Sequence, residues 1–133
     1  MATLSLTAEL SQLTTIREFV ARSGSELGLG EQALFELQLA VDEACTNVVQ
    51  HAYGGRGGMI EVTVEPGGGG VRVIVRDWGE PFELQKIPVP DVTVPLEQRK
   101  IGGLGLFLMQ QMMDDVHFDF DAEQGNTLTM VKR

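Results

Sequence analysis

The chain has 133 residues, 43% of them hydrophobic, and we expect a single domain that spans residues 1–133. Ten lysines and arginines stand against nineteen aspartates and glutamates, so the net charge is -9. Direct nucleic-acid binding is therefore not expected, because a phosphate backbone is normally met by a basic protein face.

The chain shows no targeting or membrane signal that we recognise. Its hydrophobic runs are short, and "MATLSLTAEL" lacks a basic flank and an apolar stretch of signal-peptide length. The single cysteine, Cys45, has no partner for an internal disulfide or a metal-binding pattern. We therefore expect a soluble, cytoplasmic protein without a membrane segment.

The first half of the chain is predicted to form a short strand followed by two helices. Residues 4–7 favour a strand, and apolar positions keep helical spacing from Ser11 until Gly28. A second apolar stripe runs from Leu34 to Ala52 and is followed by two glycines, which favour the end of a helix.

The second half is dominated by alternating segments. "MIEVTVE" and "VRVIVRD" flank "PGGGG" and predict a β-hairpin. Residues 78–103 contain four prolines and no sustained period, which predicts a long irregular loop. "LGLFLMQQMMDD" returns to helical spacing, and "VHFDFDA" and "NTLTMVKR" predict a final pair of strands. This order predicts an α+β, two-layer sandwich in which a mixed, mostly antiparallel sheet carries helices on one face.

Three short motifs surround the predicted loop. On a helix wheel, four polar residues of the second helix share a face away from the apolar stripe: Glu36, Glu43, Asn47 and Gln50. Asp77 ends a strand just before Gly79, and "IGGLGLFL" opens a helix whose free N–H groups could hold phosphate oxygens. Each motif alone is more often a solvated face, a turn or an ordinary helix start.

Four sequence motifs that occur in a fixed order indicate a family more strongly than any one of them alone. "DEACTNVVQHAYGG", "VRDWGEPF", "GGLGLFLMQQMMDDV" and "GNTLTM" closely resemble the motifs of the gyrase, Hsp90, histidine-kinase and MutL ATP-binding superfamily. Within it, the chain resembles the short anti-sigma-factor serine/threonine kinases of bacterial partner switching. The resemblance covers nearly the whole chain and implies the ATP-binding fold of that superfamily.

The resemblance assigns roles to individual residues. Glu43 would be the general base on a target hydroxyl, and Asn47 would coordinate Mg²⁺ beside ATP. Asp77 would accept a hydrogen bond from the adenine amino group, with room for the base at Gly79, and Thr127 would lie near the adenine. The glycine-rich helix start would bind the phosphates through Gly102, Gly103, Leu104, Gly105 and Leu106.

One position departs from the family pattern. Many relatives carry an arginine directly before the glycine pair, where it can meet the γ-phosphate, but this chain has Ile101. Arg99 and Lys100 lie just upstream, and Lys100 is the predicted catalytic substitute. The motifs for nucleotide binding are therefore all present, whereas neutralisation of the γ-phosphate charge during phosphoryl transfer depends on a residue outside the usual position.

The resemblance implies an ATP-dependent serine/threonine kinase that holds a sigma factor and phosphorylates a STAS-domain anti-anti-sigma protein, usually as a homodimer. The alternative is a regulatory module that uses nucleotide to set its affinity for a partner without phosphotransfer. A histidine-kinase catalytic domain fits less well, because neither His51 nor His117 lies in a phosphoacceptor helix. Topoisomerase and MutL-like ATPases need a longer chain.

Overall fold

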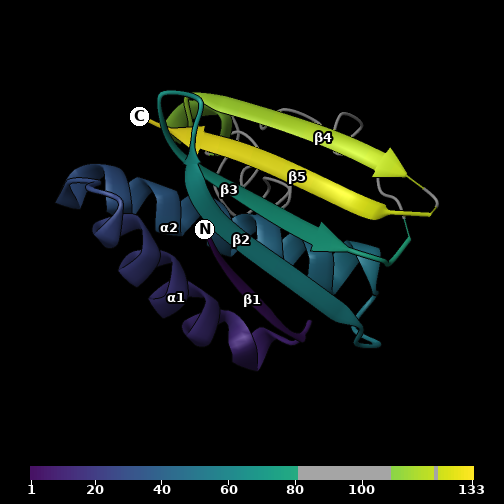
Figure 1. Cartoon of the computed structure of the whole chain (residues 1–133). Coiled ribbons are helices and arrows are strands. Elements are labelled where there is room, and N and C mark those ends of the chain that lie inside the picture. Colours follow the sequence, from purple (N-terminus) through teal and green to yellow (C-terminus); the bar gives the residue numbers. More distant parts are fainter. Residues whose placement is uncertain (81–108, 122) are drawn as a thin grey trace, which may run out of the picture.

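A computed structural model describes residues 1–80, 109–121 and 123–133 of the chain (Figure 1). Five strands form one sheet in the order β1-β2-β3-β5-β4, and each described neighbour pair is antiparallel. The strands are β1 (Ala2–Thr7), β2 (Met59–Gly67), β3 (Gly70–Asp77), β4 (Asp115–Asp121) and β5 (Gly125–Lys132). The expected mostly antiparallel sheet is confirmed.

Both predicted hairpins form. β2 and β3 pair from Ile60 opposite Asp77 to Gly67 opposite Gly70, so the glycine run makes the turn. Between β4 and β5, the Asp121 side chain accepts hydrogen bonds from the backbone N–H groups of Glu123 and Gln124. An aspartate that binds the backbone two residues on is a common way to build such a turn.

Two helices cover one face of the sheet, behind the strands in Figure 1. A 3-10 turn (Leu10–Gln12) leads into α1 (Leu13–Glu26), which begins close to the predicted start. α2 (Glu31–Asn47) begins three residues before the predicted position. It continues as a π-helical turn, η2 (Val48–Ala52), before the predicted end at the glycines.

The core lies between the helices and the inward side of each strand. Val62 and Val73 point inward from neighbouring strands and are fully buried, as are Leu37 and Cys45 of α2. Burial raises the pKa of the Cys45 thiol far above its ordinary value, because a buried thiolate would lack solvation. The alternating and helical spacings of the sequence therefore identified the faces that pack.

The region after β3 is described only in part. Residues 79–80 follow β3, and most of the predicted loop lies outside the described residues, as does the start of the helix predicted after it. The described end of that helix, residues 109–112, is helical as predicted, and Met109 is fully buried in the core. None of the described helices combines the length and apolarity needed to cross a bilayer.

Candidate functional site

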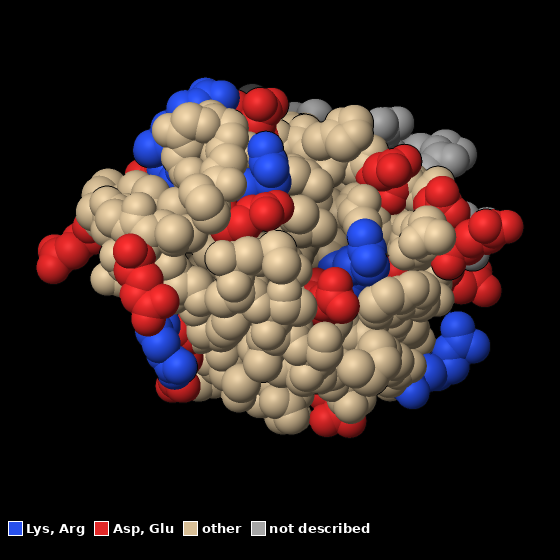
Figure 2. Space-filling model, in the orientation of Figure 1, with Lys and Arg blue, Asp and Glu red and all other residues tan. Residues whose placement is uncertain are grey.

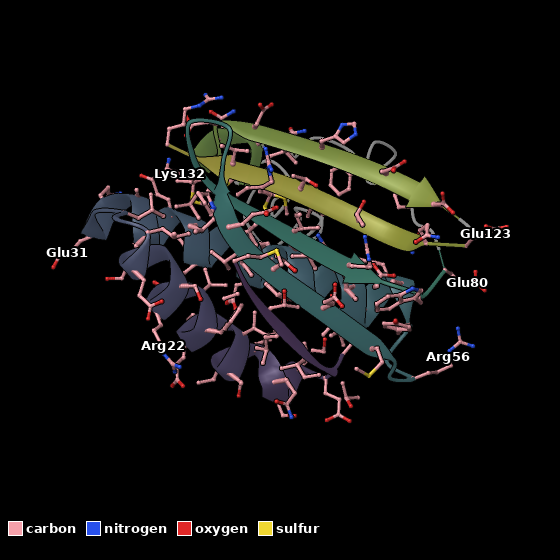
Figure 3. The ribbon with its side chains drawn as sticks, in the orientation of Figure 1. Arg22, Glu31, Arg56, Glu80, Glu123 and Lys132 are labelled. Carbon is pink, nitrogen blue, oxygen red and sulfur yellow. The ribbon has the colours of Figure 1, made fainter. Side chains whose placement is uncertain are left out.

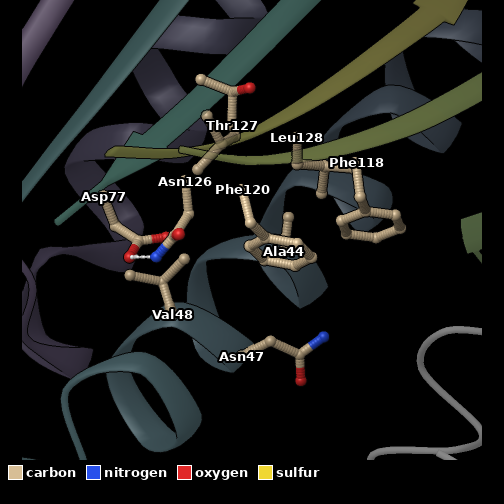
Figure 4. Close-up of a pocket in the computed structure, with 10 residues that line it drawn as sticks. Ala44, Asn47, Val48, Asp77, Phe118, Phe120, Asn126, Thr127 and Leu128 are labelled. Carbon is tan, nitrogen blue, oxygen red and sulfur yellow. Dashed lines mark hydrogen bonds between the residues drawn. The ribbon is translucent and has the colours of Figure 1, made fainter. Parts of the chain in front are cut away.

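A narrow, mostly apolar pocket lies on the helix-covered side of the sheet, where the end of α2 and the start of η2 meet β3, β4 and β5 (Figure 4). Four separate segments of the chain contribute to it. The residues that line it are Ala44, Asn47, Val48, Val75, Asp77, Phe118, Phe120, Asn126, Thr127 and Leu128.

Asp77 supplies the carboxylate of this pocket from the last position of β3. Its side chain is buried, and Oδ1 accepts hydrogen bonds from Asn126 Nδ2 (2.9 Å) and from the Gly79 N–H (2.9 Å). Within the described residues, both donors meet Oδ1, which leaves Oδ2 available to a ligand. Burial raises the pKa of Asp77, and the two donors oppose that rise because they stabilise the carboxylate.

Two glycines allow the backbone to close around Asp77. A Cβ on Gly79 would lie 2.5 Å from the carbonyl oxygen of Ala52, and the next N–H, from Glu80, donates to that same oxygen (2.8 Å). Gly125 has φ +91°, and a Cβ there would lie 2.6 Å from the Asp77 carbonyl oxygen. Gly79 is therefore required because the backbone approaches closely there, and Gly125 is required both for a close approach and for its positive φ.

Asn47 brings an unpartnered amide to the site. It is the last residue of α2 and only 3% exposed, and its Nδ2 finds no hydrogen-bond partner in the described part of the chain. The helix wheel puts Asn47 on a polar face away from the apolar stripe, and Asn47 is buried there because the pocket extends under that face. A buried polar group without a partner costs roughly 1–3 kcal/mol, which favours a ligand there.

Glu43 lies one helical turn before Asn47. Its side chain is half-buried, and burial raises the pKa of the carboxyl, with a further rise from the negative charge of Asp42. A raised carboxyl pKa suits a proton acceptor that works near neutral pH. The other two members of the predicted face separate from the site: Glu36 pairs with Lys132 (2.5 Å), and Gln50 is exposed.

Asn126 is the residue that bonds Asp77, and Thr127, which the resemblance places near the adenine, follows it on β5. Side chains alternate along β5, so Thr127 faces the other side of the sheet, and Figure 4 shows its side chain pointing away from Asp77. Thr127 still lines the pocket wall. Sequence reasoning singled out "GNT" and named only Thr127, although Asp77 and its register partner Asn126 both lie at the ends of buried alternations.

Two phenylalanines form the wall that sequence reasoning missed. Phe118 and Phe120 lie on the inward side of β4, with ring centroids 6.5 Å apart and planes within 12° of each other. The alternation of "VHFDFDA" was a usable signal, since it places both rings on one face and His117 on the other. His117 is exposed, as expected.

The predicted phosphate-binding residues lie outside the described part of the chain, so the structure does not place them relative to this pocket. They are Gly102, Gly103, Leu104, Gly105 and Leu106. Lys100, the predicted catalytic substitute, and its neighbours Arg99 and Ile101 lie outside the described residues as well.

The described pocket can recognise a flat ring. Apolar and aromatic side chains contact the faces of such a ring, and the Oδ2 atom of Asp77 can accept a hydrogen bond from its edge. Within the described residues, no group of three or more His, Cys, Asp or Glu could hold a metal by itself.

Comparisons with known proteins identify a matching family model and several relatives. The family model described as a histidine kinase-like ATPase domain matches residues 6–132. The serine-protein kinase RsbW of Bacillus licheniformis is 37% identical over 125 residues, which cover 88% of this chain and 75% of the relative. The serine-protein kinase RsbW of Bacillus thuringiensis is 29% identical and is covered to 82%.

A solved structure shares the fold. The crystal structure of the RsbU and RsbW domains of Rv1364c from Mycobacterium tuberculosis matches with a TM-score of 0.67 and 21% identity. The match covers all of this chain and 32% of that longer chain.

Proposed function

Since the chain belongs to the histidine kinase-like ATPase family, and within it to the RsbW serine-protein kinases, we propose that its pocket binds the adenine of ATP and that the bound ATP phosphorylates a protein serine or threonine. The observation that carries this proposal is the pairing of Asp77 with Asn126 at the end of an otherwise apolar, aromatic-walled pocket.

Asp77 selects adenine through its free oxygen. Its Oδ1 is occupied by Asn126 and Gly79, so Oδ2 accepts from the adenine amino group while Phe118 and Phe120 contact the ring. Guanine presents a carbonyl at that edge, which would leave the carboxylate unpaired at a cost of roughly 1–3 kcal/mol. The chain should therefore bind ATP in preference to GTP.

Asn47 and Glu43 act beside the phosphates. A side-chain amide oxygen together with phosphate oxygens and waters is a suitable ligand set for Mg²⁺, and Asn47 Oδ1 would fill that role. The Asn47 Nδ2 atom, which has no partner in the described residues, would instead donate to an oxygen of the nucleotide. When bound, Mg-ATP supplies the phosphoryl group and its neutralising charge. Glu43, with its raised pKa, accepts the proton of the target hydroxyl, and Lys100 and the run Gly102–Leu106 hold the phosphates.

The partners follow from the family. The relatives are named serine-protein kinases, and we propose that this chain phosphorylates a STAS-domain anti-anti-sigma protein and binds a sigma factor, in the cytoplasm and as a homodimer. We further propose that residues 1–133 act as one domain, since one sheet and its helices share one core. The competing function is a nucleotide-dependent binding module without phosphotransfer, which Ile101 favours because the usual arginine is missing.

Labelled ATP distinguishes the two functions. The chain is incubated with γ-labelled ATP, Mg²⁺ and each STAS-domain protein of the same genome, and label on serine or threonine of one STAS protein is the expected result. Nucleotide binding without transfer to any of them would favour the binding module. Absence of ATP binding would contradict the pocket assignment itself.

A further inference from the structure

The turn that follows β3 is held by two neighbouring residues at the end of η2. The backbone N–H of Trp78 donates to the hydroxyl oxygen of Tyr53 (2.9 Å). The backbone N–H of Glu80 donates to the carbonyl oxygen of Ala52 (2.8 Å). Tyr53 also donates its hydroxyl proton to the carbonyl oxygen of Met59, the first residue of β2 (2.6 Å). One side chain therefore joins the helix, β2 and the turn.

The residue between those two amides is Gly79, and its N–H orients the carboxylate of the pocket. It donates to Asp77 Oδ1 (2.9 Å), and an aspartate that accepts from the N–H two residues on forms an Asx-turn. The direction in which Asp77 presents its other oxygen therefore depends on where the Gly79 N–H lies. Because Trp78 and Glu80 flank Gly79, the two acceptors at the end of η2 hold this N–H from both sides.

Tyr53 is itself held in place. Its N–H donates to the carbonyl oxygen of Val48 (3.1 Å), which is the spacing of a π-helical turn. Its carbonyl oxygen accepts from the N–H (3.0 Å) and the Nε atom (3.2 Å) of Arg56. A Cβ on Gly58 would clash with the Tyr53 ring, so the glycine lets the ring approach the backbone. Burial raises the pKa of the hydroxyl, which therefore keeps its proton at neutral pH.

The outer side of the turn faces solvent. A hollow lined by Tyr53, Arg56, Trp78 and Glu80 opens at this end of the sheet, where Figure 3 shows Arg56 and Glu80. Figure 2 shows charged groups of both signs at the same end of the surface, and Trp78 is 48% exposed. Water can therefore bond the Trp78 N–H when the hydroxyl is removed. The hydroxyl matters for the position of the turn more than for folding.

We propose that Tyr53 is a positioning residue for base selection, whose hydroxyl holds the turn so that Asp77 Oδ2 faces the adenine amino group. The inference rests on the adenine site proposed above and adds to it a residue that does not line the pocket. Without the hydroxyl, the Trp78 N–H loses its fixed acceptor, and the Gly79 N–H no longer holds Asp77 in a single orientation. The carboxylate then discriminates less between purines with and without the amino group.

Tyr53→Phe tests this role because it keeps the ring and removes only the hydroxyl. Calorimetry compares the affinity for ATP with that for purine riboside triphosphate, which has hydrogen in place of the adenine amino group. The wild type should prefer ATP at least about tenfold. The variant should lose about fivefold in ATP affinity while its affinity for the analogue stays within about twofold of wild type. An ATP preference equal to that of the wild type would overturn the proposal.

Amide hydrogen exchange in the nucleotide-free protein tests the turn itself. In Tyr53→Phe, exchange should become several-fold faster at Gly79 as well as at Trp78, because loss of one anchor lets the whole turn open more often. Faster exchange at Trp78 alone would mean that the hydroxyl holds a single amide and does not position Asp77, which would contradict the proposal.

Val64→Ala is the matched control for lost stability. Val64 is buried toward the other end of β2, and it lines neither the pocket nor the turn. This variant should unfold at lower urea than wild type and keep the full preference for ATP, measured where circular dichroism shows both variants folded. A preference narrowed in Val64→Ala as well would assign the effect to general loosening and overturn the role of Tyr53.

The outcomes separate this inference from the proposed function. A wild type that binds neither ATP nor the analogue would contradict the adenine site itself. A wild type that prefers ATP, together with a Tyr53→Phe variant that prefers it equally, would contradict the role of Tyr53 alone.

Discussion

The two sides of the same sheet perform different tasks. Toward the helices, β2, β3 and β5 present aliphatic side chains until the strands end, where Asp77 and Asn126 meet in the pocket. Toward the other side, the same strands present threonine, glutamate and arginine. Alternation lets one strand contribute half of its residues to the core and the pocket and the other half to an external surface.

On the side of the sheet that carries the pocket, a buried polar group needs a hydrogen-bond partner. Asp77 and Asn126 satisfy one another, and the partner of Asn47 is expected from the ligand. On the open side, solvent can satisfy most polar groups, so a charged side chain there needs no buried partner. Changes on the two sides should therefore affect different measurements.

The largest expected effect comes from Glu43→Gln on the site side. The amide keeps the size of the side chain but cannot accept the proton, so phosphoryl transfer should fall by roughly 10²-fold or more. Nucleotide affinity should stay within a few-fold. Rapid-quench transfer assays and calorimetry measure the two quantities, and Glu31→Gln, exposed at the start of the same helix, is the matched control. Equal transfer rates in Glu43→Gln and wild type would remove the base role from Glu43.

Paired truncations test the difference between the two sides directly. Val62 is fully buried and its neighbour Thr63 faces outward on the same strand. Val62→Ala should lower the free energy of unfolding by about 2 kcal/mol through lost burial and a small cavity, whereas Thr63→Ala should change it by under about 0.5 kcal/mol. Urea denaturation at a concentration where the protein is monomeric measures both. Similar losses would mean that the open side is packed within the chain.

Asp77→Asn should lower the affinity for ATP and raise the free energy of unfolding. The amide replaces the oxygen that accepts from adenine with an NH₂ group, so ATP affinity should fall at least about tenfold and the preference over GTP should narrow. Because burial raises the folded-state pKa of Asp77, its ionised form costs stability, and that cost grows as pH rises through the folded pKa. The variant should therefore unfold at higher urea than wild type at pH 8, with a smaller difference toward pH 5.

Equal binding of ATP and GTP by the wild type would contradict the role of Asp77 in base selection. A stability difference that grows as the pH falls would contradict its buried, raised-pKa state. The two measurements are independent, because urea denaturation needs no nucleotide.

Asn126→Ala should have the smallest effect, and it tests positioning. The variant removes one of two donors to Asp77 Oδ1, so the pKa of Asp77 should rise further and ATP affinity should fall a few-fold at neutral pH. ATP affinity falls as the pH is lowered and Asp77 takes up a proton, and in the variant this fall should occur at a higher pH. Loss of packing alone would not shift the pH of that fall. Asn126→Asp is unsuitable as a control because it adds a second carboxylate. Thr129→Ala is the matched control, since it shortens an outward side chain of the same strand that does not line the pocket. A fall at an unshifted pH would make Asn126 a purely structural residue.

Sequence patterns were sufficient for the described helices and strands, but they named only some of the residues that line the pocket. Period-two runs gave the strands of the sheet, and a stripe at helical spacing gave α2, because burial of one face leaves its period in the chain. Asp77 and Gly79 were found because a charged residue and a glycine interrupt a strand of β-branched residues. The resemblance to a known family pointed to Glu43 and Asn47, which spacing alone could not separate from a solvated face.

Only the tertiary structure decided which residues meet. The pairing of β3 with β5 brings Asn126 to Asp77 across 49 positions of the sequence, and no local pattern encodes that distance. The same pairing sets the Thr127 side chain on the opposite side, and the pairing of β4 with β5 brings Phe118 and Phe120 to the pocket beside the end of α2. Likewise, the sequence alone fixed the identities of Glu61, Glu65, Arg72 and Arg76, but their arrangement in two adjacent rows follows from the register of the β2–β3 hairpin, because register determines which side chains are neighbours.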